Sequence, residues 1–190
     1  MPGLATPAPD FELPDAVSGE TIRMSTFAGK RALLVMFVSP HCPYVKHAKA
    51  ELGRLGRDYQ GRPVGIVAIS SNDVAEYPED APRGLREMAQ EAGFTFPYCY
   101  DETQETAKAY RAACTPDFFL YDHNRLLVYR GQLDDSRPGN AIPVTGADLR
   151  AAIDAVLAGE LVNPHQKPSI GCNIKWKAGN EPRYTQTGRP

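Results

Sequence analysis

One continuous apolar segment followed by a cysteine constrains the fold of this chain more than any other feature. Residues 32–38 read Ala-Leu-Leu-Val-Met-Phe-Val, an unbroken run that favours a central strand buried on both faces. After Ser-Pro-His-Cys-Pro, apolar residues recur at intervals of three or four, which is typical of an amphipathic helix. This stripe consists of Tyr44, Ala48, Leu52, Leu55 and Tyr59. Cys42 is therefore predicted to lie where a buried strand passes into a helix.

This predicted position of Cys42 favours a reactive thiolate. Unpaired amides and the positive end of the helix dipole gather at a helix N-terminus. They stabilise a thiolate over a thiol, so a cysteine there tends to have a lowered pKa. Pro43 fits the first helical turn, because the amide that it lacks would have no partner there. We therefore predict that Cys42 is a nucleophile, with a buried structural cysteine as the alternative, and that the neighbouring His41 is a candidate for stabilising its thiolate.

Length and composition limit the class of protein. A chain of 190 residues can bury a sizeable core, and we predict a single domain over 1–190, of which 160–190 is a C-terminal extension. The net charge is −2 and the basic residues are scattered, so we expect no nucleic-acid partner. No apolar run exceeds seven residues, which is too short to span a membrane. The beginning of the chain does not read as a signal peptide, so we expect a cytoplasmic protein with no membrane partner.

The remaining patterns predict an α/β fold, with a central mixed sheet flanked by helices. Strands alternate with helices early in the chain and an antiparallel hairpin comes late. Capping boxes are predicted at Asp101 with Gln104 and at Thr145 with Asp148. The predicted strands are an N-terminal hairpin over 11–24, a second buried strand over 63–69, an aromatic strand over 94–100, a hairpin over 117–132 and a tail strand over 170–176; helices are predicted near 85–92, from 101 to about 113 and near 149–157.

Cysteine usage indicates chemistry or packing rather than a disulfide scaffold. The four cysteines are Cys42, Cys99, Cys114 and Cys172. They are too sparse for a disulfide framework and lack the paired spacing of a structural zinc site. No cofactor is expected. Several charged residues are expected on the solvated surface rather than at a site: the Glu79-Asp80 pair, Arg130 and Arg137.

Several segments resemble the thioredoxin fold, and more closely its redoxin or peroxiredoxin-like branch, the alkyl hydroperoxide reductase and thiol-specific antioxidant superfamily. They are Ala-Pro-Asp-Phe at 8–11, the stretch 37–45 around Cys42, and Thr115-Pro116 before a strand. The segments 77–82 and 170–176 resemble one bacterial subgroup that lacks the second cysteine of Cys-X-X-Cys. The resemblance implies a thioredoxin-like fold with an N-terminal hairpin and a C-terminal extension. It also implies that Pro116 is cis and that Thr115 and Pro116 wall the reactive cysteine.

Two departures from the family motifs shape the prediction. Val45 stands where thioredoxins carry their second cysteine, so no two-cysteine exchange can occur within this loop. Ser39 matches the hydroxyl position of the peroxiredoxin motif, but Val35 stands where that motif has proline. A resolving cysteine must therefore come from elsewhere. Cys114, two residues before Pro116, is the first candidate; Cys172 is the second, with core packing as its more ordinary role, and Cys99 is expected to be core.

Three functions follow, in order of preference. The first is a thiol-dependent oxidoreductase in which Cys42 attacks a peroxide or a protein disulfide, with a thioredoxin-like protein or a low-molecular-weight thiol as reductant. The second is a non-enzymatic binding module that holds an extended strand near Thr115-Pro116. The third is a metal carrier through His41, Cys42 and His47, as in copper-handling thioredoxin folds. A homodimer is left open, since such folds often dimerise.

Overall fold

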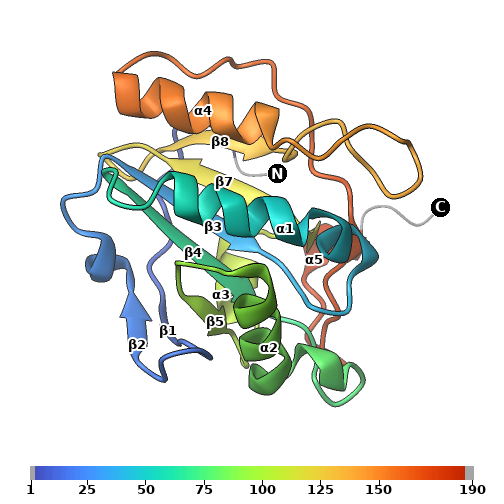
Figure 1. Cartoon of the computed structure of the whole chain (residues 1–190). Helices are drawn as coiled ribbons and strands as arrows, with labels where there is room; N and C mark the ends of the chain where they lie inside the picture. Colours follow the sequence, from blue (N-terminus) through green and yellow to red (C-terminus); the bar gives the residue numbers. More distant parts are fainter. Residues whose placement is uncertain (1–2, 187–190) are drawn as a thin grey trace.

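The structure, a computed structural model, describes residues 3–186, and its centre is a mixed sheet (Figure 1). The strand order is β5-β4-β3-β7-β8. Strand β3 pairs in parallel with β4 and antiparallel with β7, so the apolar run lies at the middle of the sheet as predicted. The strands are β3 (Ala32–Phe37), β4 (Val64–Ser70), β5 (Tyr98–Tyr100), β7 (Asp117–Tyr121) and β8 (Leu127–Gly131).

Helices cover both faces of this sheet. Because successive side chains of a strand point to opposite faces, Leu34 and Met36 of β3 pack on one side and Leu33 and Val35 on the other. The first side is covered by α1 (Pro43–Asp58), α2 (Pro82–Ala92) and α4 (Ala147–Ala158), and the second by α3 (Glu105–Tyr110) and the N-terminal hairpin (Figure 1). All six residues of β3 are buried, which explains the absence of polar alternation in its sequence.

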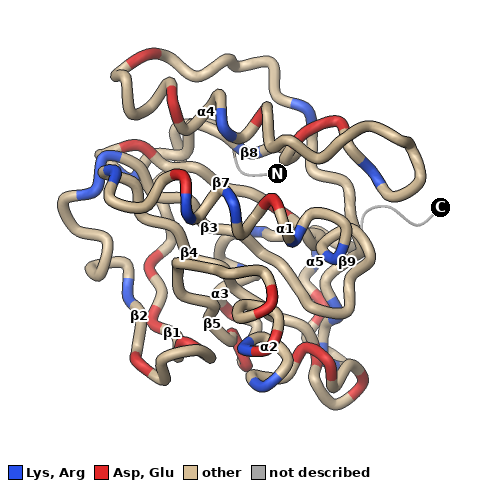
Figure 2. The backbone as a smooth tube through the Cα atoms, viewed as in Figure 1, with Lys and Arg blue, Asp and Glu red and all other residues tan. Residues whose placement is uncertain are grey.

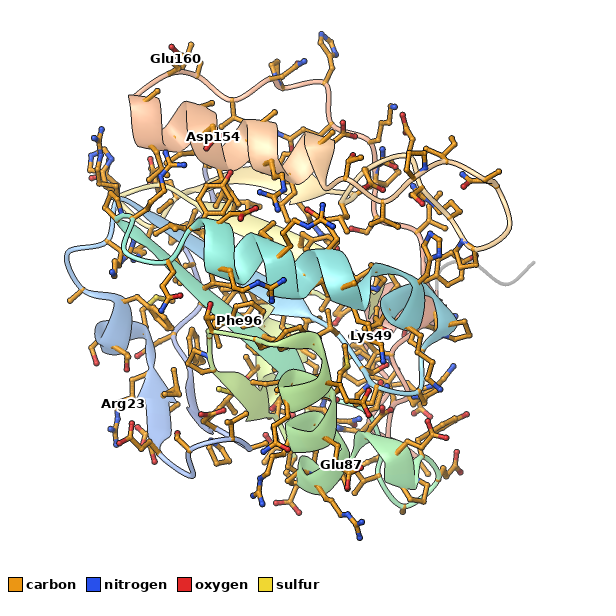
Figure 3. All side chains as sticks on the ribbon, in the orientation of Figure 1. Arg23, Lys49, Glu87, Phe96, Asp154 and Glu160 are labelled. Carbon is orange, nitrogen blue, oxygen red and sulfur yellow. The ribbon has the colours of Figure 1, made fainter. Side chains whose placement is uncertain are left out.

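Two glycines in α1 permit close packing against the segment that ends α2 and leads into β5. A Cβ at Gly53 would lie 1.9 Å from the carbonyl oxygen of Ala92. A Cβ at Gly56 would lie 2.7 Å from the ring of Phe96, which is labelled beside α1 in Figure 3. Each glycine costs the helix up to about 1 kcal/mol relative to alanine. The close approach of the neighbouring backbone and ring accounts for their presence.

Smaller elements lie around the sheet. The predicted N-terminal hairpin is confirmed as β1 (Glu12–Pro14) paired with β2 (Thr21–Arg23). Two short 3-10 turns, η1 (Met24–Phe27) and η2 (Pro78–Asp80), and a terminal helix α5 (Arg183–Gln186) complete the helical elements of the described chain. A separate two-stranded sheet joins β6 (Cys114–Thr115) to β9 (Cys172–Asn173) in the C-terminal segment.

Several predicted boundaries are wrong, and neither predicted capping box forms. Tertiary contacts engage the groups that would have formed each box. The side chain of Gln104 is not directed at its own helix but donates to the carbonyl oxygens of Ser71 and Lys175. The carboxylate of Asp134 accepts the amides of Thr145 and Gly146, so no Thr145–Asp148 box forms. Strand β5 begins only at residue 98, after Pro97, and α3 ends at residue 110.

The predicted tail strand also differs from the structure. Only residues 172–173 form a strand, and the apolar side chains of 170–176 do not share one face. Cys172 packs with the α1 side of the core, whereas Ile174 and Trp176 pack with the α3 side. The tail therefore passes across the end of the sheet. The described part of the predicted extension, 160–186, contacts the body of the fold. Residues 1–2 and 187–190 lie outside the described residues. The assignment of the chain to a single domain stays a prediction.

Two further observations concern the distribution of charged residues and the apolar character of the helices. Basic and acidic residues are interspersed along the chain in Figure 2. Between residues 3 and 186, no helix combines the length and the apolar character needed to cross a membrane.

Candidate active site

Cys42 lies at the junction predicted from the sequence. It is the N-cap residue of α1, with an extended backbone (φ −68°, ψ 123°), and Pro43 follows in the first turn. Strand β3 delivers the chain to this point and Val38 extends it by one more sheet hydrogen bond, from its amide to the carbonyl of Ile69. The thiol is completely buried (0 % exposed). Cys42 therefore has the helix start that favours a thiolate, but no direct access to solvent.

The wall of the site opposite Cys42 is the loop around Thr115 and Pro116. The peptide bond between these two residues is cis, as the resemblance implied. The thiol of Cys42 donates to the carbonyl oxygen of Thr115 at 3.1 Å. The hydroxyls of Thr115 and Ser39 lie 3.3 Å apart. Both residues were expected near the cysteine, and the structure brings them together there.

The C-terminal segment covers the remaining side of Cys42. Strand β9 pairs antiparallel with β6, so that Cys172 lies opposite Thr115 (Figure 2 labels β9 near the N-terminal end of α1). Gly171 allows this approach, since a Cβ there would lie 2.0 Å from the carbonyl oxygen of Thr115. Cys172 and Cys42 also interact electrostatically, each acting on the pKa of the other. Two cysteines separated by 130 positions in sequence thus both lie against Thr115.

The two thiols have opposite pKa shifts. Burial acts to raise the pKa of Cys42, but hydrogen bonds from Thr115, the first-turn amide of Val45 and the thiol of Cys172 outweigh it and lower the pKa. Burial raises the pKa of Cys172 to about 11, and its hydrogen bond to Cys42 acts in the same direction. Of the two thiols, Cys42 thus loses its proton more readily than Cys172.

The other two cysteines lie in environments that keep them protonated. Burial, followed by the charge of Asp117, raises the pKa of Cys114, whose thiol lies 3.6 Å from the carbonyl oxygen of Pro116. Burial also raises the pKa of Cys99, in β5, within the core. Asp117 pairs with Arg130 at 3.0 Å, with both side chains at most 5 % exposed. The expectation that Arg130 is a solvated surface residue is wrong, because this ion pair and the ring of Phe119 enclose it.

His41 contacts a carboxylate rather than the cysteine next to it. Its Nδ1 donates to Oδ2 of Asp80 at 2.5 Å, and its backbone amide donates to Oδ1 of the same group at 3.1 Å. The ring also stacks on Tyr77 at 4.7 Å between centroids. Asp80 is fully buried, so the expectation of a solvated Glu79-Asp80 pair is wrong for Asp80. No sequence signal marked Asp80, since its burial depends on a loop that folds back over the start of α1.

The two histidines near Cys42 have different partners. His47 shares a hydrogen bond with the hydroxyl of Ser136 at 2.7 Å, whereas His41 pairs with Asp80. Ser136 and Arg137 belong to the loop before α4, and Arg137 binds the carbonyls of Asp134 and Ser136. No group of three or more His, Cys, Asp or Glu side chains in residues 3–186 is placed to hold a metal ion. The structure thus does not bring His41, Cys42 and His47 together as a ligand set.

Comparisons with known proteins place the chain among its relatives. Residues 4–130 match the model of the AhpC/TSA family. The chain is 51 % identical to a hypothetical protein, SMc02350, from Sinorhizobium meliloti 1021 (TM-score 0.92, covering 94 % of this chain and 97 % of that one). It is 54 % identical to an uncharacterized conserved protein from Geobacillus kaustophilus (TM-score 0.90, covering 93 % and 94 %).

A more distant structure bears on the fold alone. The thioredoxin domain of a thiol-disulfide oxidoreductase from Bacteroides vulgatus matches with a TM-score of 0.57 at 16 % identity, over 68 % of this chain and 89 % of that one. A search of curated proteins found no significant match. The predicted thioredoxin-like fold, with a mixed sheet flanked by helices and an N-terminal hairpin, is confirmed.

Proposed function

The chain belongs to the AhpC/TSA family, and on that premise we propose that it is a dithiol oxidoreductase in which Cys42 attacks a disulfide and Cys172 resolves the product. Family membership supports a thiol-dependent redox role. The observation that carries the finer proposal is that both cysteines lie against Thr115: the Cys42 sulfur is 3.1 Å from its carbonyl oxygen, and Cys172 pairs with it across the β6–β9 sheet. The lowered pKa of Cys42 and the raised pKa of Cys172 agree with their separate roles. Cys114 was the first candidate for the resolving role; its buried contacts with Pro116 and Asp117 favour Cys172 instead.

The exchange proceeds in two balanced steps. The Cys42 thiolate attacks one sulfur of the substrate disulfide, forming a mixed disulfide and releasing one substrate thiolate. Cys172 then attacks the Cys42 sulfur, forms the Cys42–Cys172 disulfide, and releases the second substrate thiolate; its own proton passes to a leaving thiolate. The substrate disulfide gains two electrons and the cysteine pair loses them.

The first step prepares the second. Burial raises the pKa of Cys172, and while Cys42 is a thiolate its interaction with Cys172 raises that pKa further. Once Cys42 is part of a mixed disulfide, its negative charge is gone and that stabilisation of the Cys172 thiol is lost. Cys172 then loses its proton more readily and becomes the attacking group. A thioredoxin-like protein or a low-molecular-weight thiol would reduce the resulting disulfide and complete the cycle.

A peroxide is the second candidate substrate. Its support is the family membership together with two hydroxyls that can donate to a peroxide oxygen: that of Thr115, which interacts with the Cys42 sulfur, and that of Ser39, 3.3 Å from the Thr115 hydroxyl. In that case the Cys42 thiolate would take one peroxide oxygen as a sulfenic acid and release water or an alcohol. Cys172 would condense with the sulfenic acid and release water. Both candidate reactions end in the same Cys42–Cys172 disulfide.

The alternative of a binding module is less well supported. The edge of β6 near Thr115, where a partner's strand would add, is already paired with β9 of the same chain. A partner would have to displace this segment. A cytoplasmic location and a homodimer stay predictions.

A trapping experiment tests the proposed function. The Cys172→Ser variant, treated with oxidised glutathione, should accumulate a stable mixed disulfide on Cys42, because the resolving thiol is gone. The matched Cys114→Ser variant should instead form the intramolecular disulfide. Intact-mass analysis separates the products, since one bound glutathione adds its mass and an internal disulfide does not. Equal accumulation of the mixed disulfide in both variants would contradict the role of Cys172. Repeating the assay with hydrogen peroxide compares the two oxidants by their rates.

A further inference from the structure

Asn72 connects the segments that carry the two facing cysteines. It follows β4 in the loop that leads to η2, and it is 2 % exposed. Its Nδ2 donates to Oδ2 of Asp80 at 2.8 Å. Its Oδ1 accepts the backbone amide of Lys175 at 2.8 Å. One amide side chain thus donates in one direction and accepts in the other.

The donor side of Asn72 leads to Cys42. Asp80 is fully buried and holds both the backbone amide and the ring of His41, the residue before Cys42. An ionised carboxylate only accepts hydrogen bonds, so three donors converge on the two oxygens of Asp80: the amide and Nδ1 of His41 and Nδ2 of Asn72. The position of the Cys42 loop is therefore fixed through Asp80.

The acceptor side leads to Cys172. Lys175 follows Cys172 by three positions and lies two residues beyond the end of β9. Its carbonyl oxygen accepts from the amide of Asp73 at 2.8 Å and from Nε2 of Gln104 at 2.9 Å. Of Asn72, Asp73 and Gln104, only Asn72 hydrogen-bonds the amide of Lys175. Asn72 thus holds the chain close to β9, in which Cys172 pairs with Thr115 beside Cys42.

We propose that Asn72 is a positioning residue for the exchange, because it ties the Cys42 loop and the Cys172 strand to one side chain. This inference rests on the proposed function. Only a group that is both donor and acceptor can make the two contacts at once. An alanine removes one of the three donors to Asp80 and leaves the Lys175 amide without its partner, and an aspartate places a second acceptor against Asp80. The two cysteine segments would then move independently, and the effective concentration of one thiol at the other would fall.

The test compares redox equilibria of full-length variants in glutathione buffers. We expect Asn72→Ala to weaken the Cys42–Cys172 disulfide about tenfold relative to its reduced form, which corresponds to about 30 mV for a two-electron couple. Ser71→Ala is the matched control: Ser71 is the adjacent buried residue, and its hydroxyl donates to Asp101 at 2.8 Å without touching Asp80 or Lys175. It should alter unfolding stability but leave the redox equilibrium unchanged. An Asn72→Ala equilibrium equal to wild type would overturn the inference.

Two further measurements keep the outcomes distinct. If the wild-type protein forms no Cys42–Cys172 disulfide, the proposed function itself fails. If the disulfide forms and Asn72→Ala leaves its redox equilibrium unaltered, only the role of Asn72 fails. Should Asn72→Ala not fold, hydrogen exchange in the wild type decides. The Lys175 amide should exchange slowly in the reduced protein because Asn72 holds it. Exchange at the rate of a free amide would overturn the inference.

Discussion

Two buried cysteines, one in the short strand β6 and one packed against it, have opposite pKa shifts, and the difference lies in what surrounds each sulfur. Cys42 faces Thr115 of β6, whereas Cys114 is the preceding residue of the same strand. Because side chains alternate along a strand, Thr115 and Cys114 point to opposite faces. Each thiol contacts a carbonyl oxygen, Cys42 that of Thr115 and Cys114 that of Pro116. Hydrogen bonds to the Cys42 sulfur lower its pKa, whereas burial, followed by the charge of Asp117, raises the pKa of Cys114.

The comparison shows that solvent exposure alone does not set the direction of a cysteine's pKa shift. Cys42 is 0 % exposed and Cys114 is 9 % exposed, yet the pKa of Cys42 is lowered and that of Cys114 is raised. Burial raises the pKa of Cys114 and the charge of Asp117 adds to it, whereas at Cys42 hydrogen bonds from Thr115, Val45 and Cys172 outweigh burial. Reactivity at Cys42 further requires that the covering strand β9 let a substrate approach.

The largest effect is expected from removing the nucleophile. Cys42→Ser should reduce the rate of disulfide or peroxide consumption by about 100-fold or more, because the thiolate is the attacking species. Cys99→Ser is the control, since Cys99 is buried in the core on the α3 side. Steady-state consumption assays measure both. Residual activity above half of the wild-type rate in Cys42→Ser would contradict the account.

The second effect concerns the ion pair beside Cys114. Arg130→Met leaves the buried carboxylate of Asp117 without its cation and should destabilise the fold by about 3–5 kcal/mol. Burial already raises the pKa of Asp117, with Arg130 opposing that rise, so the variant raises it further. The folded variant then binds a proton more tightly than the unfolded chain, so the loss of stability is largest near neutral pH and shrinks towards pH 4. Denaturant unfolding at two pH values measures this. A loss that grows towards acid pH would contradict it.

Some features of this site could be predicted from the sequence and others could not. The run 32–38 and the stripe after it placed Cys42 at a strand–helix junction, because local periodicity and helix-start chemistry suffice for that inference. The cis bond before Pro116 followed from the resemblance and is confirmed. The meeting of Cys42 with Cys172 depends on how the last thirty residues cross the sheet, and no local pattern encodes that path.

The charged residues show the same limit. Asp80 and Arg130 were both expected on the surface, since isolated charges in polar segments are usually solvated. Their burial depends on partners distant in sequence: His41 for Asp80 and Asp117 for Arg130. Those pairings exist only once the fold has brought the loops together.

A smaller effect separates the two roles of Cys172, as a proton donor and as a resolving thiol. The rate of Cys42 alkylation rises with pH as the thiolate forms, so its midpoint reports the pKa of Cys42. In Cys172→Ala the hydrogen bond that helps to lower this pKa is lost, and the midpoint should move upward. In Cys172→Ser the hydroxyl can still donate, and the midpoint should remain lower than in the alanine variant. Identical midpoints in the two variants would show that the thiol contact does not stabilise the thiolate.

The smallest effect is expected at the other cysteine. Cys114→Ser should change the rate of disulfide formation less than about twofold, since the raised pKa of Cys114 keeps it protonated at neutral pH. Stopped-flow measurement of thiol loss tests this, with Cys172→Ser measured in parallel. A larger effect in Cys114→Ser than in Cys172→Ser would contradict the proposal that Cys172, rather than Cys114, is the resolving thiol.

The most direct test of the central claim is peptide mapping of the oxidised wild-type protein. One equivalent of oxidised glutathione is added, free thiols are blocked at acid pH, and the disulfide-linked peptides are identified by mass spectrometry. The account predicts one intramolecular disulfide, between Cys42 and Cys172, with Cys99 and Cys114 recovered as blocked free thiols. A Cys42–Cys114 disulfide, or a Cys42 that carries only glutathione, would contradict it.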